Sequence, residues 1–464
     1  MEQYKYLNLS ELSDEYIGNL ISIAGRIHNI RDQKKVGFLI LRKNVHNLQC
    51  ILVKNIIGDI KYKELSSLPC ESYIQLYGKL NKIPNNIQKI KSCSYQDFEF
   101  MIDNYKLISK SQNIPFTLDD ANNLNMEQRD RNNVSQVVRL DNRFFELRAP
   151  IYNCIFESQS DICKLFRDYL NNHGFMEIHS PKIIGTASEG GAQVFSIKYF
   201  DKNAYLAQSP QLYKQMCINS DFDKVFEIGG VYRAENTNSN RHLTEYIGLD
   251  VELEIEPNQT YYNILNLLWN LLDHIIKNVG KMKYPHPFDY IKNHYNFEEI
   301  LYPKEPLIID FKEGVKLLND AGFNQSNTED LSTENERELG KIIKNKYGSD
   351  LFILEQYPVN VRPFYTMPNE LDNNYTNSYD VIMRGEEICS GAQRIHDYDL
   401  LLNNIKSRNI NPESLQDYLN SFANGSKPHG GFGIGLERLL MLIYDLKNVR
   451  KTSLYTRDPN RLAP

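Results

Sequence analysis

The sequence lacks the features of a secreted, membrane-bound or zinc-stabilised protein. Its seven cysteines are odd in number and none stands in a Cys-x-x-Cys pair, so neither a disulfide framework nor structural zinc is expected. No apolar run is long enough to cross a membrane, and the first segment, MEQYKYLNLSELSDEY, is too polar for a signal peptide. Basic residues number 53 against 59 acidic ones, so no global positive field indicates a nucleic-acid partner. We expect a cytoplasmic protein with no membrane partner, on which any nucleic-acid site is local.

The N-terminal part contains five short runs of strand-forming residues, at 20–30, 36–42, 48–54, 72–79 and 97–108. They predict a small all-β barrel, and the five-stranded Greek-key form, the OB-fold, commonly binds single-stranded nucleic acid. The first three runs are rich in cations, namely Arg26, Arg31, Lys34, Lys35, Arg42, Lys43 and Lys54 against Asp32. These residues predict a local positive patch, although charge alone favours an all-round solvated barrel surface.

The remaining length is enough for one or two further domains. We predict an OB-fold domain over residues 1–110, a polar hinge and linker over 111–145, and a second domain over 146–464 with an insertion at about 285–357. A long helix is expected from Pro150, and an amphipathic helix over 258–279.

The segment from Lys224 to Glu254 predicts two strands joined by a charged loop that suits a nucleoside triphosphate. Alternation on the second strand places Tyr246, Asp250 and Glu252 on one face and Leu249, Val251 and Leu253 on the other. The loop supplies Arg233, Arg241 and His242, which can hold phosphate oxygens, and Tyr246 offers a flat surface for a base. A hairpin with a solvated, charged tip is the alternative for this segment alone.

A second segment, HGGFGIGLERLLMLI from His429, runs from a glycine-rich strand into a helix that carries Arg438. The glycines, Gly430, Gly431, Gly433 and Gly435, leave the strand without side chains, so a flat ligand can lie on its backbone and meet Arg438 at one end. Close packing against a helix is the more frequent reason for such glycines.

Together these segments resemble motifs 2 and 3 of the class II aminoacyl-tRNA synthetases, and their sequences are similar to those of the aspartyl-tRNA synthetases of the archaeal and eukaryotic type. Further similar stretches span nearly the whole chain, including RLDNRFFELR from Arg139, SEGGAQVF from Ser188, QSPQLYKQ from Gln208, VRPFYTMP from Val361 and RGEEICSGAQRIHD from Arg384. The resemblance implies an α+β fold, with an antiparallel sheet flanked by helices behind an N-terminal OB-fold barrel. It also implies a homodimer that pairs through the motif 1 region around Pro181.

The resemblance implies roles for the cations of the ATP segments. Arg233 matches the arginine that bridges the α-phosphate and the amino-acid carboxylate, Arg241 and His242 match residues on the outer phosphates, and Arg438 matches the arginine on the γ-phosphate. Glu235, Tyr246 and Gly435 belong to the adenine region. Glu387 and Ser390 resemble the pair that holds Mg²⁺. A regular strand would place these two on opposite faces, so a bulge or a strand end is required.

The resemblance also implies an aspartate site. Lys214 and Arg394 match the cations that bind the substrate side-chain carboxylate, and Asp250 matches the acid that orients the lysine. Ser188, Glu189 and Gln211 match residues that receive the α-ammonium group, and Ser390 lies beside them. Asparagine enzymes typically have an apolar residue followed by an acid at the position of Lys214, so LYKQ favours aspartate.

In the barrel, Phe38 and Gln49 match positions that stack on and hydrogen-bond the anticodon bases, whereas Lys110 departs from the acidic residue that relatives commonly have there. We therefore predict an aspartate-tRNA ligase that uses ATP, Mg²⁺, L-aspartate and tRNA(Asp). The alternatives are an asparaginyl-tRNA synthetase and a non-catalytic RNA-binding paralogue. Decay of Arg233, Arg241 or Arg438 would have indicated the paralogue, and all three are present.

Overall fold

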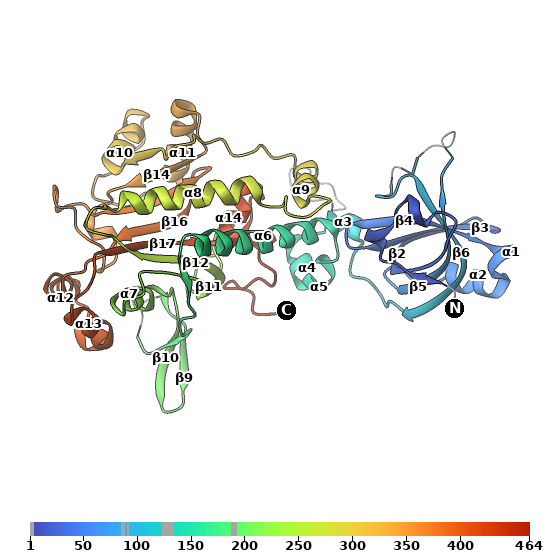
Figure 1. Ribbon diagram of the computed structural model, residues 1–464, viewed down its shortest axis with the longest axis horizontal. Coiled ribbons are helices and arrows are strands. Elements are labelled where there is room, and N and C mark those ends of the chain that lie inside the picture. The colour runs from blue at the N-terminus through green and yellow to red at the C-terminus, as the bar shows by residue number, and fades with distance from the viewer. Residues whose placement is uncertain (1–3, 85–88, 91, 123–133, 187–192) are drawn as a thin grey trace. The chain divides into compact units, whose positions relative to one another are not determined.

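The computed structural model describes residues 4–84, 89–90, 92–122, 134–186 and 193–464. The chain forms two compact units, Met1–Asn153 and Cys154–Pro464 (Figure 1). Within the described ranges, no helix has the length and hydropathy that a bilayer span requires.

The N-terminal unit is built on a closed barrel, as predicted. Its strands follow the order β1-β2-β3-β4-β6-β5, and β2 also pairs with β5 and so closes the sheet. The strands are β1 (Lys5–Tyr6), β2 (Leu20–Asp32), β3 (Val36–Lys43), β4 (His46–Val53), β5 (Tyr73–Lys82) and β6 (Phe98–Ser109). Two short helices, α1 (Lys54–Ile57) and α2 (Asp59–Ser66), connect β4 to β5. Alternate residues such as Leu39, Leu41 and Leu48 fill the interior, which is why this part of the chain forms a barrel.

The predicted positive patch is smaller than the sequence suggested. Arg42 is only 4% exposed and donates to Glu71 at 2.6 Å, and Arg26 also faces Glu71. A buried carboxylate requires cationic partners, so Arg42 serves the interior of the unit. Arg26 is partly exposed, and Lys34 and Lys35 are exposed. The expectation that Arg42 belongs to the patch was wrong.

In the described residues of the predicted linker there are three helices, α3 (Leu118–Asn122), α4 (Gln136–Asp141) and α5 (Arg143–Glu146). Glu146 is buried and accepts hydrogen bonds from Arg139, Arg143 and the Tyr152 hydroxyl. The charged motif RLDNRFFELR therefore includes a buried ion cluster in which two arginines offset the charge of Glu146.

The second unit contains an eight-stranded sheet with the order β13-β14-β15-β16-β17-β12-β11-β7, antiparallel except at its two edges. Its strands are β7 (Met176–Glu177), β11 (Lys224–Tyr232), β12 (Glu245–Glu254), β13 (Ile308–Asp310), β14 (Leu351–Glu355), β15 (Ser378–Met383), β16 (Glu386–Gln393) and β17 (His429–Gly435). A smaller sheet has the order β8-β10-β9, from β8 (Ile183–Ile184), β9 (Ser196–Tyr199) and β10 (Lys202–Leu206).

Helices flank the large sheet, as predicted for an α+β fold. In Figure 1, α6 (Pro150–Asn172) and α8 (Tyr262–Asn278) run along one face of it. Their apolar residues point inward: Phe166 packs edge-on against Phe226 of β11. The other helices are α7 (Gln211–Asn219), α9 (Pro287–Tyr295), α10 (Phe311–Asp320), α11 (Thr333–Tyr347), α12 (Tyr398–Ser407), α13 (Gln416–Ala423) and α14 (Leu436–Ile443).

Candidate active site

A cavity of about 420 Å³ opens on the large sheet, and its walls come from both ATP-type segments. Most of the predicted site residues line it, namely Gln211, Arg233, Glu235, Arg241, His242, Tyr246, Asp250, Glu387, Ser390, Arg394, Gly435 and Arg438. Lys214 lies beneath the cavity and is fully buried. Ser188 and Glu189 lie outside the described residues.

The central strand β12 forms part of the floor. Tyr246, Gly248 and Asp250 line the cavity, whereas Leu249 and Val251 are fully buried. β12 pairs with β11 without a register shift, so the predicted alternation is preserved along its whole length. The Arg233 guanidinium lies 5.9 Å from the centre of the Tyr246 ring and 3.8 Å from Glu235. A base on Tyr246 would therefore lie beside a cation.

The glycines of β17 divide into two groups. Gly433 and Gly435 line the cavity, as a floor for a flat ligand requires. A Cβ atom on Gly431 would lie 2.1 Å from the Val251 carbonyl oxygen, and one on Gly430 would lie 2.7 Å from Ile264 of α8. Gly430 and Gly431 therefore permit close packing, so the expectation that all four glycines form the ligand floor was wrong.

Two arginines and a histidine meet at one end of the cavity. The Arg438 guanidinium donates to the carbonyl oxygens of Glu387 at 2.9 Å and Arg241 at 3.1 Å, which fixes its direction. Arg241 itself donates to Glu336 at 2.8 Å. His242 accepts or donates a hydrogen bond with Ser239 at 2.6 Å. Burial, followed by the charge of Arg438, lowers the pKa of His242, so this imidazole is neutral at pH 7.

Glu336 of α11 is a site residue that the sequence did not indicate. Its two carboxylate oxygens accept from Arg241 and from the backbone N–H of Glu387. Burial raises its pKa, and Arg241 acts in the opposite direction. Because it lies in the polar stretch STENERE, far along the chain from both ATP-type segments, neither motif nor periodicity pointed to it.

The predicted bulge between Glu387 and Ser390 is present. Ile382 pairs with Glu387 and Val381 with Cys389, so Ile388 is the extra residue of β16. As a result Glu387 and Ser390 both line the cavity. Burial, followed by repulsion from Asp380, raises the pKa of Glu387. Asp380, which pairs with Ser390 across β15 and β16, was also not predicted.

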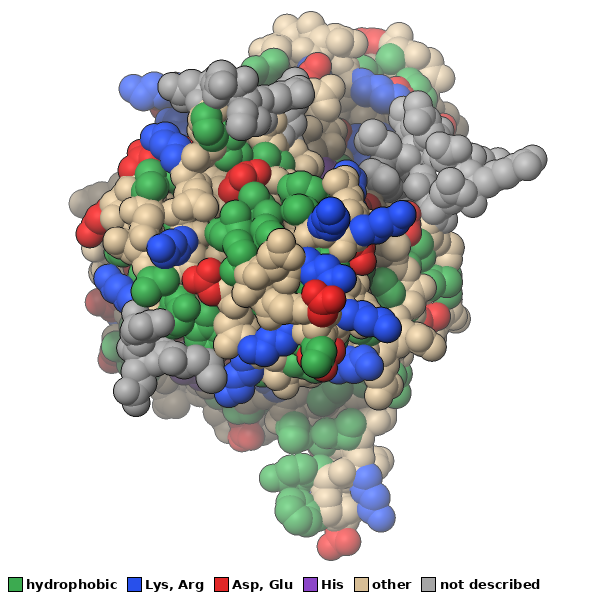
Figure 2. All heavy atoms as spheres, turned by 90° about the vertical axis from the view of Figure 1, so that its right-hand side faces the viewer, with side chains coloured by type: hydrophobic (Ala, Val, Ile, Leu, Met, Phe, Trp, Pro, Cys, Tyr) green, Lys and Arg blue, Asp and Glu red, His purple; other side chains and the backbone are tan. Residues whose placement is uncertain are grey.

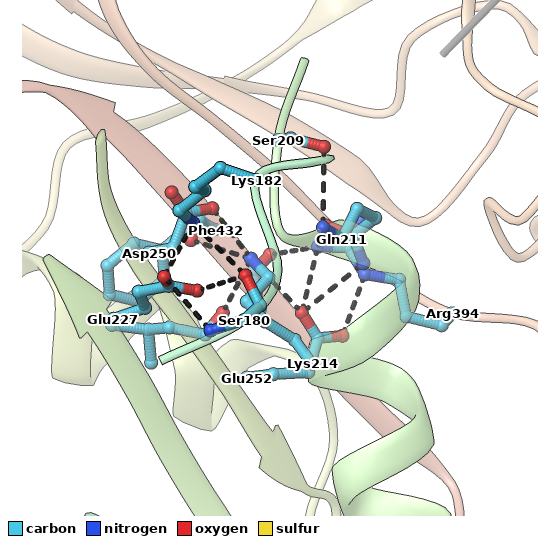
Figure 3. Close-up of polar contacts among 12 residues, drawn as sticks. Ser180, Lys182, Ser209, Gln211, Lys214, Glu227, Asp250, Glu252, Arg394 and Phe432 are labelled. Atoms are coloured by element: carbon cyan, nitrogen blue, oxygen red, sulfur yellow. Dashed lines mark hydrogen bonds and ion pairs between the residues drawn. The ribbon is translucent and has the colours of Figure 1, made fainter. Parts of the chain in front are cut away.

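The residues assigned to the substrate carboxylate form a buried ion cluster (Figure 3). Lys214 donates to Asp250 at 2.9 Å, and Arg394 donates through Nε to Glu252 at 2.9 Å. Lys214 lies 3.5 Å from Glu252, and Gln211 accepts from Arg394 at 3.2 Å. Glu252 was placed on the correct face of the strand but given no role, although it contacts both cations. Arg394 and Lys214 lower its pKa against the opposing effect of burial, so it is a carboxylate at neutral pH.

Phe38 and Gln49 lie in the other unit, on the outer surface of the barrel. Phe38 pairs with Ile51 and Gln49 with Ile40, so the two are diagonal neighbours across β3 and β4. Gln49 donates to Glu99 at 2.7 Å. Figure 2, which looks onto the N-terminal unit, shows Lys and Arg side chains gathered beside an apolar area. The described residues contain no group of three or more His, Cys, Asp or Glu side chains arranged for a metal ion.

The chain matches known proteins over both units. Residues 135–459 match the class II tRNA synthetases (D, K and N), and residues 21–108 match the OB-fold nucleic acid binding domain. The cytoplasmic aspartate–tRNA ligase of Bos taurus is 42% identical, over 99% of this chain and 91% of its own length. The aspartyl tRNA synthetase from Entamoeba histolytica has a TM-score of 0.90 at 36% identity, over 99% of this chain and 93% of that one. The asparaginyl-tRNA synthetase from Pyrococcus horikoshii has a TM-score of 0.86 at 26% identity, over 99% and 100% of the two chains.

Proposed function

The chain belongs to the class II tRNA synthetases, among the aspartate–tRNA ligases, and we propose that it activates L-aspartate with ATP and transfers it to tRNA(Asp). In the first step an oxygen of the aspartate α-carboxylate attacks the α-phosphorus of ATP, and pyrophosphate leaves. In the second step a hydroxyl of the terminal adenosine of the tRNA attacks the acyl carbon, and AMP leaves.

The buried cluster of Lys214, Arg394 and Glu252 carries the proposal. Arg394 in the cavity lining and Lys214 beneath it provide fixed partners for a side-chain carboxylate, and Glu252 and Asp250 hold them in place. A neutral amide would leave one of these cations less well satisfied, so the site favours aspartate over asparagine.

The other end of the cavity suits the triphosphate. Attack of a carboxylate on a phosphate brings two anions together, and Arg233, Arg241 and Arg438 offset that repulsion. A neutral His242 can still donate one hydrogen bond to an outer phosphate. Tyr246, Glu235 and Gly435 surround the place of the adenine.

The donor set beside Arg438 fits Mg²⁺. Glu387 and Ser390 offer hard oxygen ligands, and the Oδ1 atom of Asp380 is buried without a hydrogen-bond partner among the described residues. Such a site takes one or two protein ligands and completes its coordination with phosphate and water oxygens. When bound, the ion would offset the negative charge of the phosphates.

Phe38 and Gln49 support the proposal that the barrel binds the anticodon, since a partly exposed aromatic ring and an amide on one strand pair suit unstacked bases. We further propose that two copies pair through the motif 1 region near Pro181. The cytoplasmic names of the relatives support a cytoplasmic location.

Exchange of pyrophosphate into ATP, measured with each of the twenty amino acids, tests the substrate. Aspartate should give the highest rate. The similarity to asparaginyl-tRNA synthetases makes asparagine the second candidate, and a preference for asparagine would contradict the proposal. No exchange with any amino acid, in folded protein, would instead favour a non-catalytic RNA-binding role.

A further inference from the structure

Arg362 lies where two strands bring together the residues proposed to hold Mg²⁺. It follows a single 3-10 turn, η4 (Val359–Val361), and lines the cavity. Its Nη2 atom donates to Asp380 at 2.7 Å and its Nη1 atom to the Ser390 hydroxyl oxygen at 3.1 Å. Because Asp380 and Ser390 are cross-strand partners, one guanidinium group bridges β15 and β16.

Tyr357 and Arg408 also fix the position of Arg362, in addition to its bonds to the two strands. The Arg362 guanidinium lies 3.7 Å from the centre of the Tyr357 ring. Arg408 donates to the carbonyl oxygens of Val359 at 2.7 Å and Arg362 at 2.6 Å, so the turn that carries Arg362 is fixed to the α12 segment. The two donors of Arg362 are therefore preorganised toward the strands.

The charges at this end of the cavity require a fixed cation. Asp380 is the cross-strand partner of Ser390, and Glu387 precedes Ser390 on β16 across the bulge, so the two carboxylates flank this hydroxyl. Two free carboxylates would attract a divalent ion strongly, and the ion would lie between them. Arg362 offsets Asp380, and its bond to Ser390 occupies one lone pair of that hydroxyl and leaves the other for a ligand.

We infer that Arg362 is a positioning residue for the divalent cation that accompanies ATP: by pairing with Asp380 and orienting Ser390, it confines the ion to Glu387 and Ser390. This inference rests on the proposed function. A residue that only stabilised the fold would, when replaced, weaken ion binding and activity together. Loss of Arg362 should instead strengthen ion binding and lower activity.

Mn²⁺ binding to the full-length, ATP-free protein, followed by electron paramagnetic resonance, gives a readout that does not depend on turnover. Arg362→Gln should bind Mn²⁺ at least about fivefold more tightly than wild type, because one carboxylate charge is no longer offset. Its kcat for pyrophosphate exchange should fall about tenfold or more, because the ion is displaced from the phosphates. Its KM for aspartate should stay within about twofold of wild type, because Lys214 and Arg394 are unchanged.

The double variant Arg362→Gln/Asp380→Asn separates charge from packing. It removes the carboxylate that Arg362 offsets, so its Mn²⁺ affinity should return to within about twofold of wild type. Arg337→Gln is the matched control, because Arg337 is half-exposed and pairs with Glu386 at 2.8 Å outside the cavity lining. It should leave Mn²⁺ affinity and exchange unchanged.

Unchanged or weaker Mn²⁺ binding by folded Arg362→Gln would overturn the inference, as would a double variant that keeps the higher affinity. If Arg362→Gln does not fold, Arg362→Lys keeps the charge but cannot bridge both strands. It should then bind Mn²⁺ as wild type does with a lower kcat, and an unchanged kcat would overturn the inference. Failure of wild type to activate aspartate would contradict the proposed function instead.

Discussion

At the scale of single residues, the cations of the site divide the work between the two substrates. Arg438 donates to two backbone carbonyls and Arg241 donates to Glu336, whereas Lys214 and Arg394 share the buried Glu252. In the proposed function, phosphate binding therefore uses Arg241 and Arg438 at the cavity wall, and side-chain recognition uses Arg394 in the lining and Lys214 beneath it. Substitutions in the two groups should have different kinetic consequences.

Arg438→Ala should abolish adenylate formation in a protein that still folds. Removal of a fixed phosphate contact costs on the order of 3 kcal/mol or more, which is roughly a hundredfold or more in exchange rate. Arg233→Ala should behave in the same way, since Arg233 lies over Tyr246 at the cavity wall. Near-normal exchange in either variant would refute the assignment.

Lys214→Met should raise the KM for aspartate steeply, by roughly a hundredfold, with the KM for ATP little changed. The substrate carboxylate loses a desolvated partner, and Glu252 and Asp250 lose their shared cation. Lys427→Met serves as the control, because it removes a lysine that pairs with Asp223 and Glu254 away from the cavity. A parallel rise in both KM values would indicate a general loss of structure.

Glu437 should make the stability of the second unit depend on pH. Burial raises its pKa from 4.5 to about 7, although both carboxylate oxygens accept from the Ile247 N–H. The folded state therefore holds this proton more tightly than the unfolded state. The associated stability is present below about pH 4.5 and is lost as the pH rises to about 7, by up to about 3 kcal/mol.

Glu437→Gln should remove the loss of stability that wild type shows as the pH rises. Relative to wild type, its free energy of unfolding should rise between pH 5 and pH 7.5 by up to about 3 kcal/mol. Urea unfolding followed by the fluorescence of Trp269, the single tryptophan and a buried residue of α8, reports on this unit. Equal pH profiles for the two proteins would show that Glu437 titrates normally.

At the scale of elements, the glycines of strand β17 have two different roles: Gly431 permits close packing, and Gly435 lies in the floor of the cavity. A Cβ atom at Gly431 would meet a backbone oxygen, whereas the nearest atom to one at Gly435 is Arg438 Cβ at 3.9 Å. Backbone atoms cannot move aside as a flexible side chain can. A methyl group at Gly431 would therefore clash, whereas one at Gly435 would fit.

Gly431→Ala should destabilise the second unit by about 3 kcal/mol or prevent its folding. Gly435→Ala should fold normally and raise the KM for ATP several-fold, because its methyl group would occupy the floor of the cavity. Urea unfolding and exchange kinetics distinguish the two outcomes. A stable, active Gly431→Ala protein would contradict the packing argument.

Periodicity predicted the elements well because each barrel strand and the β12 floor bury one face. Tyr246, Gly248 and Asp250 lie on one face in the structure, as alternation required. It could not predict residues brought in by tertiary contact. Glu336, Arg362 and Asp380 lie on α11, a turn and β15, and only the packing of those elements places them beside Glu387 and Ser390. The motifs that carried the resemblance also did not distinguish Gly431, which packs, from Gly433, which lines the cavity.

At the scale of the whole molecule, recognition of tRNA and amino-acid activation fall in separate compact units. Phe38→Ala should therefore leave tRNA-independent exchange intact and lower kcat/KM for tRNA about tenfold or more, since stacking on one aromatic ring contributes about 1 to 3 kcal/mol per base. Gln49→Ala should act in the same direction. Aminoacylation and exchange assays on the same preparation measure both quantities.

The loss should shrink for a tRNA with a wrong anticodon, because that contact is then missing with both enzymes. Unchanged charging of tRNA(Asp) by folded Phe38→Ala would remove the assignment of the barrel as an anticodon reader. A parallel loss of exchange would mean that the barrel supports the catalytic unit.

The single extra residue Ile388 also restricts how the length of β16 can change during evolution. It sets the phase between Glu387 on one side of the bulge and Ser390 to Gln393 on the other. Deletion of one residue here would turn one part of the strand over. Either the Glu387 side chain or the Ser390 side chain would then point away from the cavity. Sequences that diverge at the positions of this strand outside the site can keep its geometry, whereas a gain or loss of one residue would turn part of the strand over.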